Sequence, residues 1–190
     1  MRPATDEHAL NARRAMDQFL AGVERQAFRI AQISVRSEAD ALDIVQDAMI
    51  RLVKSYGQRD ESEWKPLFFR ILRNRINDHL RHQTVRNRVL SWFVSPRPDG
   101  SAPPDPLDAA PAAANTRPDE QVSMDETMVE LEQAVRDLPG RQREAFLLRT
   151  IEGMDVATTA RAMGCSAGSV KTHYSRAVHS LRAILGEHWS

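Results

Sequence analysis

The sequence predicts an all-α protein built from two small helical domains. Alternating runs of β-branched and aromatic residues, which strands require, are absent from the 190 residues. Apolar residues instead recur at spacings of three and four on both sides of residues 95–121, which hold seven of the ten prolines. Such a stretch buries too little apolar surface to offset its ordering entropy. We therefore expect a flexible linker at 95–121, between an N-terminal domain over 1–94 and a C-terminal domain over 122–190.

Three helices are expected in the N-terminal domain. The first covers about 6–34, and the second follows the N-cap Ser37 and stops near Gly57. The third begins with Pro66 as its first residue and runs to 81, or as far as 90. The spacing predicts an inner face on the second helix formed by Leu42, Val45, Met49, Leu52 and Tyr56.

Near the C-terminus the residues have the spacing of a helix-turn-helix. Asp155 and Ser166 can cap two successive helices, and Gly164 between them supplies the positive φ of a tight turn. Ala160 is small where the two helices approach, and Val170 is apolar where the second helix locks onto the first. Small, turn and apolar positions at this spacing are typical of a motif that reads DNA.

The second helix of this motif divides into an apolar stripe and a polar face. The stripe comprises Val170, Tyr174, Ala177, Val178, Leu181, Ile184 and Leu185. The other face carries cations and hydroxyls, which bind phosphates and base edges. The candidate DNA-binding residues are Gly168, Ser169, Lys171, Thr172, Ser175 and Arg176. A solvated face of an ordinary bundle would also be polar, but the turn, the stripe and the basic face agree on DNA reading.

Two more helices are expected before the motif, which spans 155–184. They cover 122–138 and 141–151 and are separated by Pro139 and Gly140, which interrupt helices.

Charge is distributed unevenly along a chain whose 26 acidic and 26 basic residues balance overall. Residues 1–94 carry 16 Lys/Arg and 12 Asp/Glu, residues 95–137 carry 3 and 10, and residues 138–190 carry 7 and 4. The most basic stretch, 64–88, has seven Lys/Arg and one acid. Two basic blocks joined by an acidic one suggest two modules that face nucleic acid. A solvated face remains the plainer alternative for the arginines of 64–88.

The sequence gives no indication of catalysis. It contains no Gly-rich phosphate loop, no metal-binding carboxylate cluster and no recognisable nucleophile–base pair. Cys165 is the only cysteine, and the six histidines show no metal-ligand spacing, so we expect no disulfide, metal, cofactor or catalytic residue. No signal peptide or membrane-spanning stretch is recognisable, so a cytoplasmic protein with no membrane insertion is expected.

Three stretches, in order along the chain, resemble the extracytoplasmic-function group of bacterial RNA polymerase sigma factors. Residues 40–51, with the pattern Asp-x-x-Gln-Asp, look like the helix that docks on the polymerase. Residues 66–81 look like the helix that melts and reads the −10 promoter element, and 138–181 is similar to the domain that reads the −35 element. Each motif alone is weakly specific, but the three in order around a linker are strong.

The resemblance implies a non-enzymatic subunit that binds core RNA polymerase and promoter DNA, with an anti-sigma factor as a further candidate partner. It assigns polymerase binding to Asp43, Gln46, Asp47 and Arg51. It assigns the −10 element to Trp64, Arg70, Asn74, Asn77, Asp78 and Arg81, and the −35 element to the candidate residues of the helix-turn-helix. The loop at 57–64, beside these −10 residues, could hold an extruded base.

Several alternatives stay open at this point. The acidic face around Asp43 could be merely solvated, and Trp64 could pack in the core. The linker could mimic RNA in the polymerase channel or act as a plain tether. The sequence also has Leu67 where the family usually has tryptophan, and Thr159 where the family has an apolar residue. The competing function is a stand-alone helix-turn-helix regulator whose N-terminal domain dimerises or senses a ligand.

Overall fold

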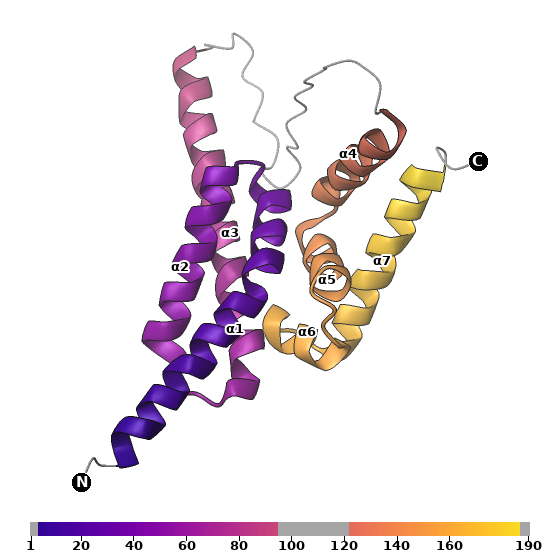
Figure 1. The fold of residues 1–190 in the computed structure, drawn as a ribbon. Helices are drawn as coiled ribbons and strands as arrows, with labels where there is room; N and C mark the ends of the chain where they lie inside the picture. Colours follow the sequence, from indigo (N-terminus) through magenta and orange to yellow (C-terminus); the bar gives the residue numbers. More distant parts are fainter. Residues whose placement is uncertain (1–3, 95–121, 187–190) are drawn as a thin grey trace.

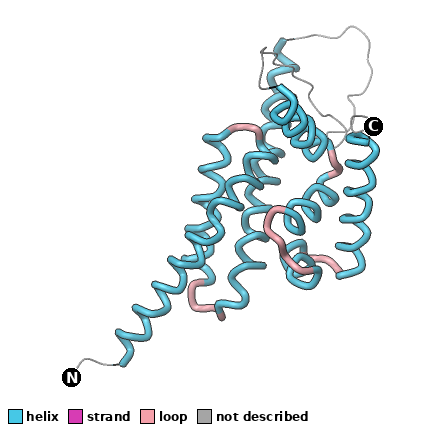
Figure 2. Tube along the Cα trace, turned by 45° about the vertical axis from the view of Figure 1, so that its right-hand side comes forward, coloured by secondary structure: helices cyan, strands magenta, loops and turns pink. Residues whose placement is uncertain are grey.

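The computed structural model describes residues 4–94 and 122–186, which form seven helices and no strand (Figures 1 and 2). The all-α prediction is therefore confirmed. The N-terminal unit comprises α1 (Ala4–Val35), α2 (Glu38–Tyr56) and α3 (Glu61–Val94). The C-terminal unit comprises α4 (Val122–Asp137), α5 (Gly140–Thr150), α6 (Val156–Met163) and α7 (Ala167–Gly186). The predicted linker at 95–121 lies outside the described residues.

Helix α2 begins at the predicted cap, and four of the five residues predicted for its inner face are buried or pack on the core, namely Val45, Met49, Leu52 and Tyr56. The Ser37 hydroxyl accepts a hydrogen bond from the Asp40 backbone N–H, at 3.2 Å. Leu42, predicted to be buried, is 45% exposed. The buried face consists of Ala41, Ile44, Val45, Ala48 and Leu52. Alanines at two of these positions allow α2 to pack close to its neighbours, which turns the helix so that Leu42 faces outward.

Helix α3 starts five residues earlier than predicted, so Pro66 lies inside the helix instead of at its first position. Asp60 organises the first turn, because its side chain accepts from the Ser62 backbone N–H at 2.9 Å and its carbonyl accepts from the Glu63 N–H. The hydrogen bonds to Ser62 lower the pKa of Asp60. Pro66 is the sixth residue of α3, so it removes the one backbone bond that an N–H at this position would make to the Ser62 carbonyl.

The C-terminal unit starts its second helix as the sequence predicts. Pro139 occupies the N-cap position of α5, and its carbonyl accepts from the Gln142 and Arg143 N–H groups. Helix α7 packs on α5, where Tyr174 stacks on Phe146 with ring centroids 6.3 Å apart. Ile184, predicted to be part of the buried stripe of α7, is 46% exposed, because it lies near the helix end, beyond the turn of Leu181.

The two units lie against one another. Helix α6 sits at their boundary and packs on α3, while α4 contacts α1 (Figure 1). In both views the N-terminal part of α1 extends beyond the bundle (Figure 2). None of the helices in the described part of the chain is long and apolar enough to cross a membrane.

Candidate nucleic-acid interface

The turn between α6 and α7 has the geometry of a helix-turn-helix. Gly164 adopts a left-handed conformation, with φ 62° and ψ 42°, and ends α6 by donating its N–H to the Ala160 carbonyl. Ser166 begins the next helix, because its hydroxyl accepts from the Ser169 N–H at 3.1 Å. Ala160 and Val170 are both buried, as their places in the motif require. The predicted turn is therefore present, residue by residue.

The first helix of the motif contains a polar residue in its core. Thr159 is fully buried, and its hydroxyl donates to the Asp155 carbonyl at 2.7 Å. Because a buried hydroxyl is costly only when it lacks a partner, threonine fits this position without loss of the motif. Asp155 caps the same helix by accepting from the Thr158 N–H at 2.7 Å, and these hydrogen bonds lower the pKa of its carboxyl group.

Helix α7 presents most of the predicted DNA-binding residues to solvent. Val170, Ala177 and Leu181 are buried and fix the helix on the rest of the unit. The exposed residues of the predicted set are Gly168, Lys171, Thr172, Ser175 and Arg176.

Ser169 is the exception in this set, because it is half-buried and its hydroxyl lies 2.9 Å from that of Ser166. Ser169 thus helps to cap the helix, and its hydroxyl is less available to DNA than the exposed groups of α7.

The predicted −10 residues from Arg70 to Arg81 share one side of α3, because they recur at spacings of three and four. Asn74, Asn77, Asp78 and Arg81 are all exposed. The Asn74 side-chain oxygen accepts two hydrogen bonds from Arg73, at 3.2 and 2.8 Å, and Asp78 lies 3.9 Å from Arg81. This half of α3 is thus an open surface with amide, carboxylate and guanidinium groups.

The other half of the same α3 face contacts α6, although Arg70 stays exposed and Arg73 is half-buried. Arg70 donates to the Arg161 carbonyl at 2.5 Å, and Arg73 donates to the Met163 carbonyl at 2.8 Å. The sequence predicted Arg70 as a DNA contact but gave no indication of α6 as its partner. Residue spacing shows which side chains share a face of a helix, but it does not show which element packs on that face.

Trp64 lies in the core and not in a base pocket. It is 3% exposed, and its ring packs 5.8 Å from Phe19, which in turn meets Phe68 edge-on at 6.2 Å. The alternative interpretation of Trp64 as a core residue therefore agrees with the structure, and its assignment to DNA does not. The bulky apolar body of tryptophan gains more from this aromatic cluster than from solvent.

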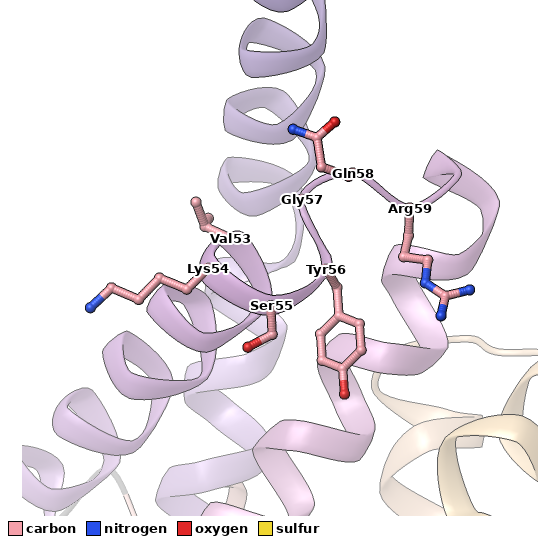
Figure 3. Close-up of a pocket in the computed structure, with 7 residues that line it drawn as sticks. All are labelled: Val53, Lys54, Ser55, Tyr56, Gly57, Gln58 and Arg59. Carbon is pink, nitrogen blue, oxygen red and sulfur yellow. The ribbon is translucent and has the colours of Figure 1, made fainter.

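The loop after α2 forms a pocket that is separate from the −10 residues. Its lining comprises Val53, Lys54, Ser55, Tyr56, Gly57, Gln58 and Arg59, and these side chains point in different directions (Figure 3). Asn74 is 14 residues along α3 from Asp60, or about 20 Å at 1.5 Å per residue. The loop and the Asn74 region therefore do not form one pocket.

Helix α2 presents a mixed acidic and apolar face. Asp43, Gln46, Asp47 and Arg51 are exposed, as their predicted role requires. Three large apolar side chains on the same side are also exposed, namely Leu42 (45%), Ile50 (51%) and Val53 (48%). Spacings of three, four and eight place them beside the acidic residues. Exposed apolar side chains gathered on one helix face indicate a protein-binding surface, and the inward assignment of Leu42 concealed it.

Comparisons with known proteins match both units. The family model described as sigma-70 region 2 matches residues 17–86, and the one described as sigma-70, region 4 matches residues 128–181. The ECF RNA polymerase sigma factor SigM of Mycobacterium tuberculosis is 31% identical over 181 residues, covering 94% of this chain and 81% of SigM. The ferric citrate uptake sigma factor FecI of Escherichia coli is 28% identical over 144 residues, covering 76% and 75%.

The fold is also similar to a solved structure, the sigma factor RpoE of Bartonella quintana in complex with the anti-sigma factor NepR. That chain is 22% identical, with a TM-score of 0.66, and the match covers 90% of this chain and 96% of RpoE. Several observations point to the same family. They are the helix-turn-helix, the exposed faces of α2 and α3, the two matched regions and the relationship to SigM. The chain belongs to the extracytoplasmic-function family of RNA polymerase sigma factors, which direct promoter-specific initiation of transcription.

Proposed function

We propose that each function of this sigma factor resides on one exposed helix face. Core RNA polymerase binds the α2 face of Asp43, Gln46, Asp47 and Arg51. The −10 element is read by the exposed side chains of α3, namely Arg70, Asn74, Asn77, Asp78 and Arg81. The −35 element is read by the exposed face of α7. In this proposal residues 1–94 form the polymerase and −10 domain, 122–190 form the −35 domain, and 95–121 link them.

The composition of the α2 face is the observation that carries the docking proposal. Acidic side chains alone would be consistent with a solvated surface, since most exposed carboxylates need no partner. Leu42, Ile50 and Val53 beside them add apolar area that water hydrates poorly. A partner that buries this face gains from apolar contact, and basic side chains on that partner would pair with Asp43 and Asp47.

Charge reversal on α2 tests this docking role. The variant Asp43→Lys with Asp47→Lys should fail to co-elute with core RNA polymerase and should lose run-off transcription, because like charges would then face the partner's basic groups. The matched control is Asp17→Lys with Glu24→Lys, which reverses two exposed acids on α1. Circular dichroism should show both variants folded. Undiminished co-elution of the α2 variant would contradict the docking role.

The amide and carboxylate side chains of α3 are suited to binding the bases of single-stranded DNA. An amide such as Asn74 or Asn77 offers both a donor and an acceptor, and Asp78 can accept from an exocyclic amine. A base shows these edges fully only after it leaves the duplex. On α7, Lys171 and Arg176 carry the charge that phosphates attract, and arginine can also pair with both acceptor atoms of guanine.

Further partners follow from the same family. The NepR complex of the Bartonella protein supports an anti-sigma factor as a candidate partner here. We infer that the protein acts in the cytoplasm, beside polymerase and chromosome, and that it has no enzymatic activity of its own. The stand-alone regulator is disfavoured, because the family relationship extends across both units of the chain.

A further inference from the structure

The segment between α5 and α6 is held on α5 by backbone hydrogen bonds. The Glu152 N–H bonds to the Leu147 carbonyl at 3.3 Å, and the Met154 N–H bonds to the Leu148 carbonyl at 3.1 Å. Gly153 between them adopts a positive φ of 67°, which lets the chain turn within two residues. The Met154 side chain is buried, so the start of α6 is anchored on α5 through this segment.

Arg149, in the last turn of α5, reinforces this anchor and also contacts the second helix of the motif. Its guanidinium group donates a hydrogen bond to the Met154 carbonyl, directly before the Asp155 cap of α6. The same group lies over the ring of Tyr174 on α7, with the guanidinium carbon 5.8 Å from the ring centroid. A cation at this distance is attracted by the negative face of an aromatic ring. One side chain of α5 therefore contacts both the start of α6 and the body of α7.

Tyr174 lies at the border between the buried side and the DNA-facing side of α7. Its side chain is half-buried, and its ring stacks on Phe146 of α5 with the two ring planes 17° apart. Lys171 is three residues before Tyr174 and adjoins it on the helix surface, while Ser175 and Arg176 follow it directly. The way in which Tyr174 seats on α5 therefore determines where these exposed side chains of α7 point.

Apolar packing holds α7 on the core but restricts its rotation less than directional contacts do. Val170, Ala177 and Leu181 are the buried anchors of α7, and the burial of apolar surface is non-directional. Hydrogen bonds and aromatic contacts have preferred geometries, so the contacts of Arg149 and Tyr174 restrict the rotation of α7 relative to α6. This restriction matters because side chains that bind a target must be held within about 0.5 Å of the productive geometry.

We propose that Arg149 and Tyr174 form a positioning pair that aligns the exposed face of α7 with the start of α6 and thereby sets the base specificity at the −35 element. This inference rests on the proposed reading of that element by α7. In a helix-turn-helix the first helix crosses the DNA backbone and the second lies in the major groove, so their mutual orientation decides which base edges are reached. Arg149 acts through Met154 and Tyr174 and contacts no base itself.

The first test measures base discrimination by polymerase holoenzyme, which is the ratio of its affinities for the cognate −35 element and for a single-base variant. For the wild type this ratio should be roughly 5- to 150-fold. Arg149→Met keeps the apolar stem but removes the charge and the donors, so it should lower the ratio about fivefold, the fold-change that corresponds to one cation–π contact. Arg149→Lys keeps a cation and a donor and should restore most of the ratio.

The second test asks whether the two side chains act as one unit. Tyr174→Leu removes the ring and should lower the ratio by the same factor as Arg149→Met, whereas Tyr174→Phe keeps the ring and should keep the wild-type ratio. Arg149→Met with Tyr174→Leu should lower the ratio no further than either single substitution, since each already breaks the same contact. If Arg149→Met does not fold, the difference between the Tyr174→Leu and Tyr174→Phe proteins tests the same pair.

The matched control removes another half-buried guanidinium group of α5. Arg143 donates to the Arg136 carbonyl of α4 at 2.6 Å. Arg143→Met should lower the free energy of unfolding, as Arg149→Met does, because both lose a hydrogen bond to a backbone carbonyl. It should leave the discrimination ratio unchanged, because it leaves the contacts of Tyr174 in place. A purely structural role of Arg149 would instead make the two variants behave alike.

Several results would overturn the positioning role. One is a wild-type discrimination ratio in the folded Arg149→Met protein, and another is an equal ratio in the Tyr174→Leu and Tyr174→Phe proteins. A uniform loss of affinity on all sequences, with a salt slope reduced by about one, would place Arg149 on a phosphate instead. Arg176→Ala separates this inference from the function on which it rests. If Arg176→Ala lowers the ratio and Arg149→Met does not, only the positioning role fails, and if neither does, the reading of the −35 element by α7 fails.

Discussion

Two substitutions at Trp64 distinguish a structural role of this side chain from a DNA-contacting role. Trp64→Ala should lower the free energy of unfolding by about 3–5 kcal/mol, because it leaves a cavity beside Phe19 and Phe68. Trp64→Phe keeps an aromatic ring in that cluster and should leave promoter opening intact. Urea denaturation measures the first effect, and permanganate reactivity of thymines near the start site measures the second. Lost opening in a stable Trp64→Phe protein would mean that the ring does stack on a base.

Asp155 couples the stability of the reading motif to pH. Its pKa is lowered by the hydrogen bonds from Thr158, so the folded state favours the ionised carboxylate. The resulting stability is present above the ordinary pKa of 3.8 and is lost as pH falls through the lower folded value. Asp155→Ala should therefore lower the thermal midpoint at neutral pH, and the difference from wild type should shrink as pH falls below about 3.8.

Asparagine at the same position provides the control for this prediction. Asp155→Asn retains a capping oxygen without a charge that titrates, so it should keep most of the stability at neutral pH. Its thermal midpoint relative to wild type should rise in acid, where wild type loses the ionised cap. If the difference in thermal midpoint between wild type and Asp155→Ala did not change with pH, the carboxylate charge would have no role in the cap.

Helix α7 carries a prediction that distinguishes base reading from backbone contact. Arg176→Ala should weaken binding to the cognate −35 site by about 1–3 kcal/mol and relax specificity at one or two base pairs, if the guanidinium pairs with guanine. Lys171→Ala should weaken binding to all sequences alike and reduce the salt slope by about one. Binding titrations of polymerase holoenzyme on a set of single-base promoter variants measure both effects.

Arg182→Ala removes another exposed arginine further along α7 and should change neither quantity. A uniform loss for Arg176→Ala, with no change in base preference, would place that side chain on a phosphate.

The helices themselves were largely predictable from short-range patterns. Ser37, Asp155 and Gly164 specify helix ends through contacts within four residues, and sequence spacing reveals such contacts directly. The wrong predictions concern features that tertiary packing determines, namely the buried face of α2 and the start of α3. Leu42 faces outward because the alanines of α2 take the buried side, and α3 starts at the Asp60 turn before Pro66. The period of the apolar residues alone predicts neither the outward orientation of Leu42 nor the start of α3.

At the scale of the whole molecule, the sequence predicted the two units but not their contact. The sequence resemblance identified candidate binding residues on α2, α3 and α7, because the residues on each helix form a local sequence pattern. The bonds from Arg73 to Met163 and from Lys65 to Glu152 join residues about 90 positions apart. An arginine predicted on the grounds of charge to meet DNA can equally cap a helix end, so composition alone could not assign its partner.

The arginines that meet the ends of α1 and α6 also bear on how the two units separate. Separation would remove the bond from Arg136 to the Ile33 carbonyl and the bond from Arg73 to the Met163 carbonyl together, while Met163 would keep its bond from Arg141 of the same unit. A break at one end loosens the geometry that holds the other, so we expect the contacts to be lost cooperatively. A transition of this kind has few half-open molecules, and the fraction that is open then responds steeply to any ligand that prefers the open state.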